Sequence, residues 1–152
     1  MQKISPFLWF DHQAEEAAKF YTSIFRNSKV GRIARYGDAG PGPKGSVMTI
    51  AFELDGQEFA ALNGGPQFKF NHAISFVVNC ETQAEVDEMW RKLSAGGEIE
   101  QCGWLRDKYG VSWQIVPAAL HKLLQSPKAD QVMQALMTMK KLDIAALERA
   151  AA

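Results

Sequence analysis

The chain has 152 residues, of which 47% are hydrophobic and 22% charged, and its 17 basic and 17 acidic side chains cancel. This composition is typical of a globular chain that buries a core without disulfides, as one domain or as two small halves sharing a core. With no basic block and no apolar run near the roughly 20 residues that cross a bilayer, neither nucleic acid nor a membrane is an expected partner. Two cysteines without metal-binding spacing and an N-terminus without a signal-peptide profile predict a cytoplasmic location.

The first half of the chain has the pattern of a strand, a helix and three further strands. Apolar residues at helical spacing follow Asp11, an expected N-cap, and Asn27 ends that helix. Glycine and proline then mark a flexible loop, and Asp55–Gly56 is a dipeptide typical of a type I′ hairpin turn. The predicted elements are a strand at 4–10, a helix opened by residue 11, a strand at 30–36, a loop at 37–45 and hairpin strands at 46–54 and 57–63.

The same pattern starts again after a linker at residues 64–71. Thr82 and Glu85 form a capping box before a helix whose apolar residues recur at i, i+3, i+4 and i+7. The letters QAE occur at 13–15 and again at 83–85, each time opening a helix just after an apolar strand. The shared element order favours an internal duplication. The predicted elements of the second half are strands at 72–79, 98–105 and 111–116, with the helix after the first of them.

The last 35 residues are expected to be helical. A short helix is predicted at 120–124 and a terminal one at 142–150, with Asp143 as its cap. Between them, Ser126 is the expected N-cap of a third helix, with Pro127 at its first position. The methionines of this region, which are adaptable in packing, either dock on the chain's own sheet or contact a second subunit; they are Met133, Met137 and Met139.

Five stretches carry a family resemblance: FYTSIF (20–25), FAALNGGPQFKFN (59–71), ISFVVNCETQAEVDEMW (74–90), GWLRDKYGVSWQIVP (103–117) and VMQALMTMKKLDIAALERA (132–150). They resemble the vicinal oxygen chelate superfamily, which includes glyoxalase I, bleomycin-resistance proteins and extradiol dioxygenases. Within it they resemble the PhnB-like branch, often labelled as demethylubiquinone methyltransferase domain proteins. The resemblance covers nearly the whole chain. It implies an α+β fold of two βαβββ modules whose curled mixed sheets form a small-molecule cleft, followed by C-terminal helices.

The resemblance also implies how the chain is organised. A single domain spanning 1–152 is expected, with module one at about 1–64, module two at about 71–117 and a helical tail at about 118–152. Proteins of this kind commonly form homodimers, often completing the site across the interface.

In metal-using relatives the ligands come one from each of four strands. By position they fall on Pro6, on residues 61–63, on His72 as the fifth-strand histidine, and on Gln114. Proline has no donor atom, and only Asn63 of residues 61–63 offers an oxygen, so one imidazole and two neutral amides remain. A divalent transition ion needs three or four good donors and charge to offset its desolvation. We therefore expect no tightly bound metal and no other cofactor, although water or ligand oxygens can complete a weak metal site at His72.

The expected ligand site combines His72, Asn63 and Gln114. Strand parity puts Gln114 on the face opposite Trp113, as a hydrogen-bonded core amide or as the floor of a polar ligand site. His72 is either a structural group or a site residue suited to acid–base catalysis. Asn63 precedes Gly64–Gly65, where the backbone can approach a ligand closely.

Weaker candidates surround these three residues. Phe68 and Phe70 either wall the cleft or belong to the core, and Trp104 is placed on a turn at its rim. Asp107 and Lys108 on that turn are explained equally well by a surface salt bridge.

Other residues are assigned to no site. Trp9 and Trp113 are expected to face the helices and form core. His12 and His121 lie outside the expected strand positions and are interpreted as solvated surface histidines.

The residues leave open whether the protein is an enzyme. The loss of charged or imidazole donors at Pro6 and Gln114 favours a small-molecule-binding protein of the glyoxalase/bleomycin-resistance type, holding a planar or aromatic compound without a metal. The alternative is a metal-dependent or His72-assisted enzyme, such as an isomerase, a lyase or a dioxygenase-like protein. Methyl transfer is the least supported, because no strand leads through a glycine-rich turn into a helix.

Overall fold

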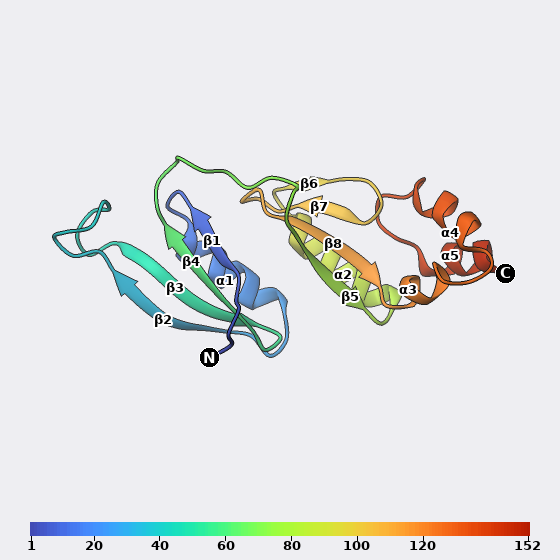
Figure 1. Cartoon of the computed structure of the whole chain (residues 1–152), viewed down its shortest axis with the longest axis horizontal. Coiled ribbons are helices and arrows are strands. Elements are labelled where there is room, and N and C mark those ends of the chain that lie inside the picture. Colours follow the sequence, from blue (N-terminus) through green and yellow to red (C-terminus); the bar gives the residue numbers. More distant parts are fainter. The chain divides into compact units, whose positions relative to one another are not determined.

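The computed structural model describes residues 1–152, which divide into two compact units, Met1–Lys69 and Phe70–Ala152. Each unit repeats the order strand, helix, strand, strand, strand and forms a four-stranded mixed sheet with a helix on one face (Figure 1). The predicted α+β class with two βαβββ modules and C-terminal helices is confirmed. No helix has the length and apolar character that a membrane span needs. That the modules act as a single domain stays a prediction.

The first unit consists of one sheet in the strand order β1-β4-β3-β2 and one helix. β1 pairs with β4 in parallel, whereas β3 pairs antiparallel with both β4 and β2. Asp55 (φ 48°) and Gly56 (φ 80°) turn the chain between β3 and β4, as the sequence predicts. The elements are β1 (Phe7–Phe10), α1 (Ala14–Ile24), β2 (Lys29–Arg35), β3 (Val47–Leu54) and β4 (Gln57–Asn63).

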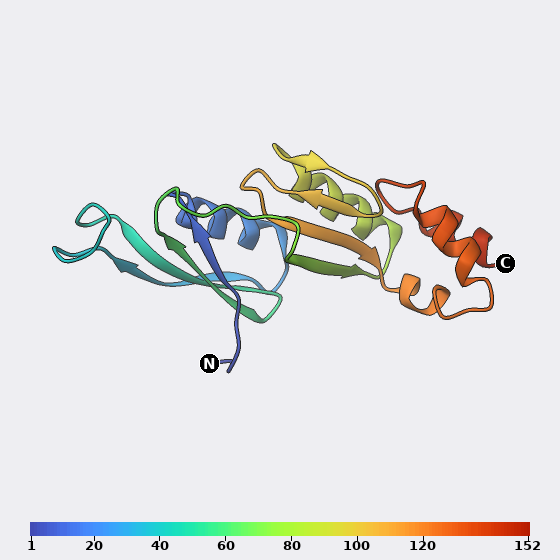
Figure 2. The ribbon, with the colours of Figure 1, turned by 45° about the horizontal axis from the view of Figure 1, so that its top comes forward.

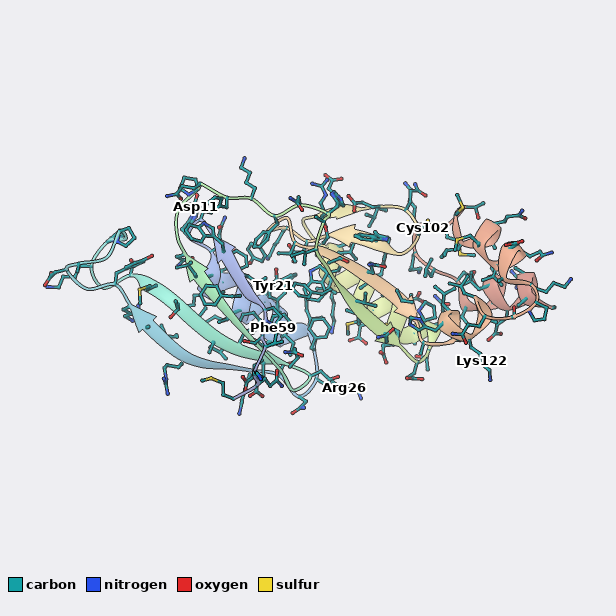
Figure 3. All side chains as sticks on the ribbon, in the orientation of Figure 1. Asp11, Tyr21, Arg26, Phe59, Cys102 and Lys122 are labelled. Atoms are coloured by element: carbon teal, nitrogen blue, oxygen red, sulfur yellow. The ribbon has the colours of Figure 1, made fainter.

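The core of the first unit lies between α1 and the sheet. Tyr21 of α1 is fully buried, and its ring stacks on Phe52 with 6.2 Å between the ring centroids. Phe52 in turn stacks on Phe59 at 5.3 Å (Figure 3, where Tyr21 and Phe59 are labelled). α1 packs here because its buried residues recur on one side of the helix.

Trp9 lies on the sheet face opposite α1, so the prediction that it faces the helix is wrong. Its neighbours Leu8 and Phe10 are 7% and 3% exposed, and strand alternation turns Trp9 the other way. There its indole Nε1 donates to the carbonyl of Gly65 (3.0 Å), and its ring meets Phe68 edge-on at 5.0 Å. Phe68 is itself 65% exposed, so it packs on Trp9 rather than in the core.

The N-terminus of α1 is capped from a distant part of the chain. The predicted N-cap Asp11 is wrong, since the helix begins at Ala14 and Gln13 occupies the cap position without a side-chain cap bond. The N–H of Ala14 instead donates to Oδ1 of Asn63, at 2.8 Å. A side chain at the end of β4 therefore does what a local cap does elsewhere.

The second unit has the strand order β5-β8-β7-β6. The predicted N-cap of its long helix is confirmed, because Oγ1 of Thr82 accepts from the N–H of Glu85 (3.2 Å). The predicted strand at 98–105 is wrong as one piece: Cys102 (φ 60°) and Gly103 (φ 85°) turn the chain and divide it. The elements are β5 (Ser75–Cys80), α2 (Gln83–Ser94), β6 (Glu98–Ile99), β7 (Trp104–Arg106) and β8 (Ser112–Pro117).

α2 covers one face of the second sheet (Figure 2). Trp113, predicted to be core, is 3% exposed and packs on this side, so that prediction is confirmed. Asp107 is 3% exposed as well, and its carboxylate accepts from the N–H groups of Tyr109 and Val111 and from the indole of Trp113. The interpretation of Asp107 as a surface salt-bridge residue is therefore wrong.

The C-terminal residues form a helical cluster beyond the end of β8 (Figure 1). Asp143 caps the last helix as predicted, since its Oδ1 accepts from the N–H of Ala146 (3.0 Å). The expected N-cap Ser126 is wrong, because the middle helix begins at Ala129 with Lys128 before it. The helices are α3 (Ala119–Leu123), α4 (Ala129–Leu136) and α5 (Ile144–Ala151).

This cluster has a core of its own and is tied to the sheet by backbone hydrogen bonds. The N–H groups of Cys102 and Gly103 donate to the carbonyls of Met139 and Lys140, each at 2.8 Å. The core is formed by Val116, Leu120, Val132, Leu136, Leu142 and Leu147.

Two methionines of the tail lie outside its core. Met133 and Met137 are 42% and 65% exposed, so neither docks on the chain's own sheet. That they contact a second subunit stays a prediction.

Candidate functional site

The first unit contains a pocket of about 690 Å³ beside the end of β1, where Figure 3 labels Asp11. Its volume falls in the range of about 300–1,000 Å³ that is usual for small-molecule sites. Three segments build its walls: the start of α1, the loop at 37–46, and the turn after β4. The lining residues include Asp11, His12, Glu15, Arg35, Tyr36, Pro41, Gly42, Asn63, Gly64, Gly65 and Gln67.

Tyr36 holds the loop that forms one wall of this pocket. Its ring is 6% exposed, and its hydroxyl donates to the backbone carbonyl of Asn63. A Cβ at Gly40 or Gly42 would lie 2.4 or 2.3 Å from that ring. The glycines of this loop therefore allow the backbone to wrap closely around an aromatic side chain.

Asn63 is the one predicted site residue in the wall of this pocket. Its Oδ1 accepts from Ala14, and its Nδ2 donates to the carbonyl of Val47 (3.2 Å). A side-chain amide has two donors and two acceptor positions, so one of each remains for a ligand. Asn63 thus joins α1 to the sheet and still presents polar atoms at the pocket.

The charged lining of the pocket was missed by sequence reasoning. Asp11 had been assigned to a helix cap, and Glu15 and Arg35 stood in ordinary positions of a helix and a strand. His12 is a surface histidine as interpreted, with a side chain 77% exposed, and its Nδ1 lies 3.5 Å from Asp11. No local pattern connects these residues, because they meet only once β1, α1 and β2 have assembled.

In the second unit, the sheet face opposite α2, hereafter the open face, carries a row of polar side chains. Gln114 lies there, as parity predicts, and its Nε2 donates to Oγ of Ser75 (2.9 Å). Strand register places Gln114 beside Val77 and Trp104. Trp104 is therefore the first residue of β7 rather than part of a turn. Val77 is 47% exposed on this face.

His72 lies in a turn before β5, so the prediction that it belongs to a strand is wrong. Its side chain is 54% exposed, and its Nε2 lies 2.9 Å from Oε2 of Glu100. The same oxygen accepts from Nε of Arg106 at 3.0 Å. The His72 ring is 6.4 Å from that of Trp104. His72, Trp104 and Gln114 therefore belong to the same unit. Phe70 belongs to it as well and is partly exposed.

Glu100 is stabilised as a carboxylate. Its partial burial opposes ionisation, but hydrogen bonds from His72 and Arg106 outweigh this and lower the pKa of Glu100. A carboxyl with a lowered folded-state pKa contributes stability above its unfolded pKa and loses it as the pH falls through the folded value. Glu100→Gln is expected to lower the free energy of unfolding at pH 7, and the deficit should shrink as the pH falls below the unfolded-state pKa of about 4.3. Urea unfolding at neutral and at acidic pH measures this change in stability, and Glu148→Gln, at an exposed position, is the control. An equal deficit at the two pH values would contradict the prediction.

Cys80 is not placed as a nucleophile. Burial raises the pKa of the Cys80 thiol to about 12, and the nearby charge of Glu85 adds to this. A thiol in that state is inert at neutral pH. Cys102 is also a free thiol, partly exposed in the turn before β7.

The residues at the four positions carried over from metal-using relatives do not fit a divalent transition ion. The backbone carbonyl of Pro6 accepts from Ala60 (3.0 Å), and Ala61 is fully buried. Asn63 and Gln114 supply neutral amides that are already hydrogen-bonded. No group of three His, Cys, Asp or Glu side chains within either unit is arranged to hold a metal ion.

Solved structures share this fold. They include a fosfomycin resistance protein FosX from Listeria monocytogenes, complexed with Mn(II) and sulfate (16% identity, TM-score 0.54, 82% of this chain and 97% of that chain). A glyoxylase/bleomycin resistance protein/dioxygenase domain from Frankia sp. EAN1pec has 14% identity and a TM-score of 0.51, over 77% of this chain and 98% of that one. The fold is that of the vicinal oxygen chelate superfamily.

A PhnB protein from Bacillus cereus is 43% identical, with a TM-score of 0.71 over 77% of this chain and 100% of that one. The model of the 3-demethylubiquinone-9 3-methyltransferase family matches residues 2–116. The chain therefore belongs to this PhnB-like family. A comparison with curated proteins finds no match. The family match ends at residue 116, so the likeness is carried by the two modules, and the predicted likeness of the tail stays a prediction.

Proposed function

We propose that this protein binds a small planar or aromatic molecule, in the manner of the glyoxalase/bleomycin-resistance type, without a tightly bound metal. The observation that carries the proposal is the pocket of about 690 Å³ in the first unit. One wall is the loop that packs around Tyr36, and the lining carries both charges and free amide atoms that can orient a ligand.

Binding without a metal is supported by the chemistry of the donors. An imidazole and two neutral amides supply no anionic charge, and a dication needs such charge to leave water. FosX from Listeria monocytogenes, described with Mn(II), shares only the fold with this chain. A stoichiometric metal is therefore not part of the proposal.

A second candidate, a His72-assisted isomerase or lyase, is favoured by one contact. The carboxylate of Glu100 holds Nε2 of His72, which orients the ring and leaves Nδ1 for a substrate. Imidazoles held in this way serve as general bases. The methyl transfer named in the family description is not favoured. None of the three strand-to-helix connections, at residues 11–13, 81–82 and 118, contains glycine.

We further propose a reducing, cytoplasmic setting and a homodimer. Two free cysteines support the first. The exposed Met133 and Met137 are the candidate subunit contact of the second.

The test combines metal analysis with ligand binding. We expect less than one tenth of an equivalent of Zn, Ni, Mn or Fe in the purified chain, and hits from a panel of planar aromatic compounds by saturation-transfer NMR, unchanged by EDTA. Arg35→Gln, which removes a charge from the pocket, should weaken the best hit about tenfold, the worth of one charged hydrogen bond. Arg26→Gln, at an exposed position just after α1, is the matched control. A full equivalent of metal with binding lost in EDTA would instead establish the metal-dependent alternative.

A further inference from the structure

One buried hydroxyl on the second sheet has no hydrogen-bond partner. Ser112 is 1% exposed, and its Oγ is the unsatisfied side-chain atom of the buried interior. A hydroxyl buried without a partner is costly to the fold, and native proteins retain few of them. Ser112 therefore calls for a partner that is absent from the free chain.

The neighbours of Ser112 on the open face are hydrogen-bond donors. Register puts Ser75 on one side of it and Arg106 on the other. The hydroxyl of Ser75 accepts from Gln114, which leaves its own proton and one amide N–H of Gln114 free. The terminal nitrogens of Arg106 add four more N–H groups, since only Nε is used, by Glu100.

The acceptors on this face are fewer than the donors. The Glu100 carboxylate is already shared between His72 and Arg106, so the acceptors left on this face are Oε1 of Gln114 and the hydroxyl oxygens of Ser75 and Ser112. A surface with surplus donors and a guanidinium edge is matched by a group rich in acceptor oxygens. Arg106 has 42% of its side chain exposed, so this member of the row is in contact with solvent while Ser112 lies buried beside it.

We propose that this row binds the anionic oxygen group of a small molecule, a carboxylate or a phosphonate, with the hydroxyl of Ser112 donating beside the guanidinium of Arg106. Trp104 and Val77 in the adjacent register row supply an apolar surface for the planar body of the same molecule. This row lies in the second unit, whereas the pocket that carries the proposed function lies in the first, so the assignment goes beyond that function.

The test uses phenylphosphonate and benzoate as anionic probes and benzyl alcohol as the uncharged analogue, each titrated into the full chain by calorimetry. We expect at least one of the two anions to bind at least tenfold more tightly than benzyl alcohol. Whichever of the two anions binds more tightly identifies the anionic group, phosphonate or carboxylate, that the row binds. Arg106→Gln should reduce its affinity at least tenfold, whereas Arg91→Gln, on α2 and so on the other side of the sheet, should leave it unchanged.

Ser112→Ala separates a ligand role from a purely structural one. Removing the unpaired hydroxyl should raise Tm by about 2–4 °C while lowering the affinity for the anion severalfold. A raised Tm with unchanged affinity would overturn the proposal, as would equal binding of benzyl alcohol. If the anions fail while the aromatic panel still binds, this assignment is wrong and the proposed function stands. If no compound of either set binds, the proposed function itself fails.

Discussion

Asp107→Ala is expected to lower the free energy of unfolding by about 3–5 kcal/mol, the largest single effect we anticipate. The carboxylate is 3% exposed and accepts from Tyr109 N (2.8 Å), Val111 N (3.1 Å) and Trp113 Nε1 (2.9 Å). Alanine leaves all three donors without this partner inside the core. Each hydrogen bond to a charged group contributes about 1.5–3 kcal/mol, and such terms do not add fully.

Urea unfolding followed by tryptophan fluorescence measures this loss. Asp38→Ala is the control, because that side chain is 86% exposed and its ion pair with Lys44 is expected to contribute less than about 1 kcal/mol. Asp107→Asn keeps one acceptor oxygen but places an amide near N–H donors, so its loss should be intermediate. A loss below 1 kcal/mol for Asp107→Ala would show that the carboxylate does not organise this turn.

Gly97→Ala is expected to cost about 3 kcal/mol or more. Gly97 follows α2, and a Cβ there would lie 2.1 Å from the carbonyl oxygen of Arg106 and 2.7 Å from the carbonyl carbon of Asp107. Both atoms belong to the backbone, so the clash is not relieved by rotating a side chain. Either β6 separates from β7 or the end of α2 shifts.

Gly37→Ala is the matched control for this substitution. A Cβ at Gly37 meets nothing within 4 Å, so alanine there should be neutral or slightly stabilising through the unfolded chain. Thermal unfolding of both variants by circular dichroism compares the two positions directly. Equal Tm values for the two variants would contradict this prediction. They would mean that the backbone between α2 and β6 shifts to accept the extra methyl group at little cost in stability.

Some features of this protein were predictable from short stretches of sequence. The turn at Asp55–Gly56 and the caps at Thr82 and Asp143 each depend on residues a few positions apart, and all three are confirmed. The placement of Gln114 opposite Trp113 follows from the two-residue period of a strand. Local chemistry is enough in these cases, because the interacting groups are neighbours along the chain.

Parts of the candidate site were beyond such reasoning. Asn63, predicted to contact a ligand, also caps α1 although it is 49 positions from Ala14 in the sequence, and it takes the place of the local cap expected at Asp11. His72 ended in a turn because β5 begins only at Ser75, where pairing with Ser112 starts. The sequence does not reveal that the hydroxyl of Ser112 lacks a hydrogen-bond partner, because this depends on which polar groups lie near it in the folded chain.

The amino-acid sequence by itself determined the duplicated strand–helix–strand–strand–strand order, its turns and most of its core, because periodic burial and capping act over a few residues. Tertiary structure alone decided which polar side chains meet. The charged pocket beside β1 joins the start of a helix, a loop and a turn, and the donor row around Ser112 joins three strands, all distant in sequence. The row depends on strand register, and register is a property of the assembled sheet rather than of any one strand.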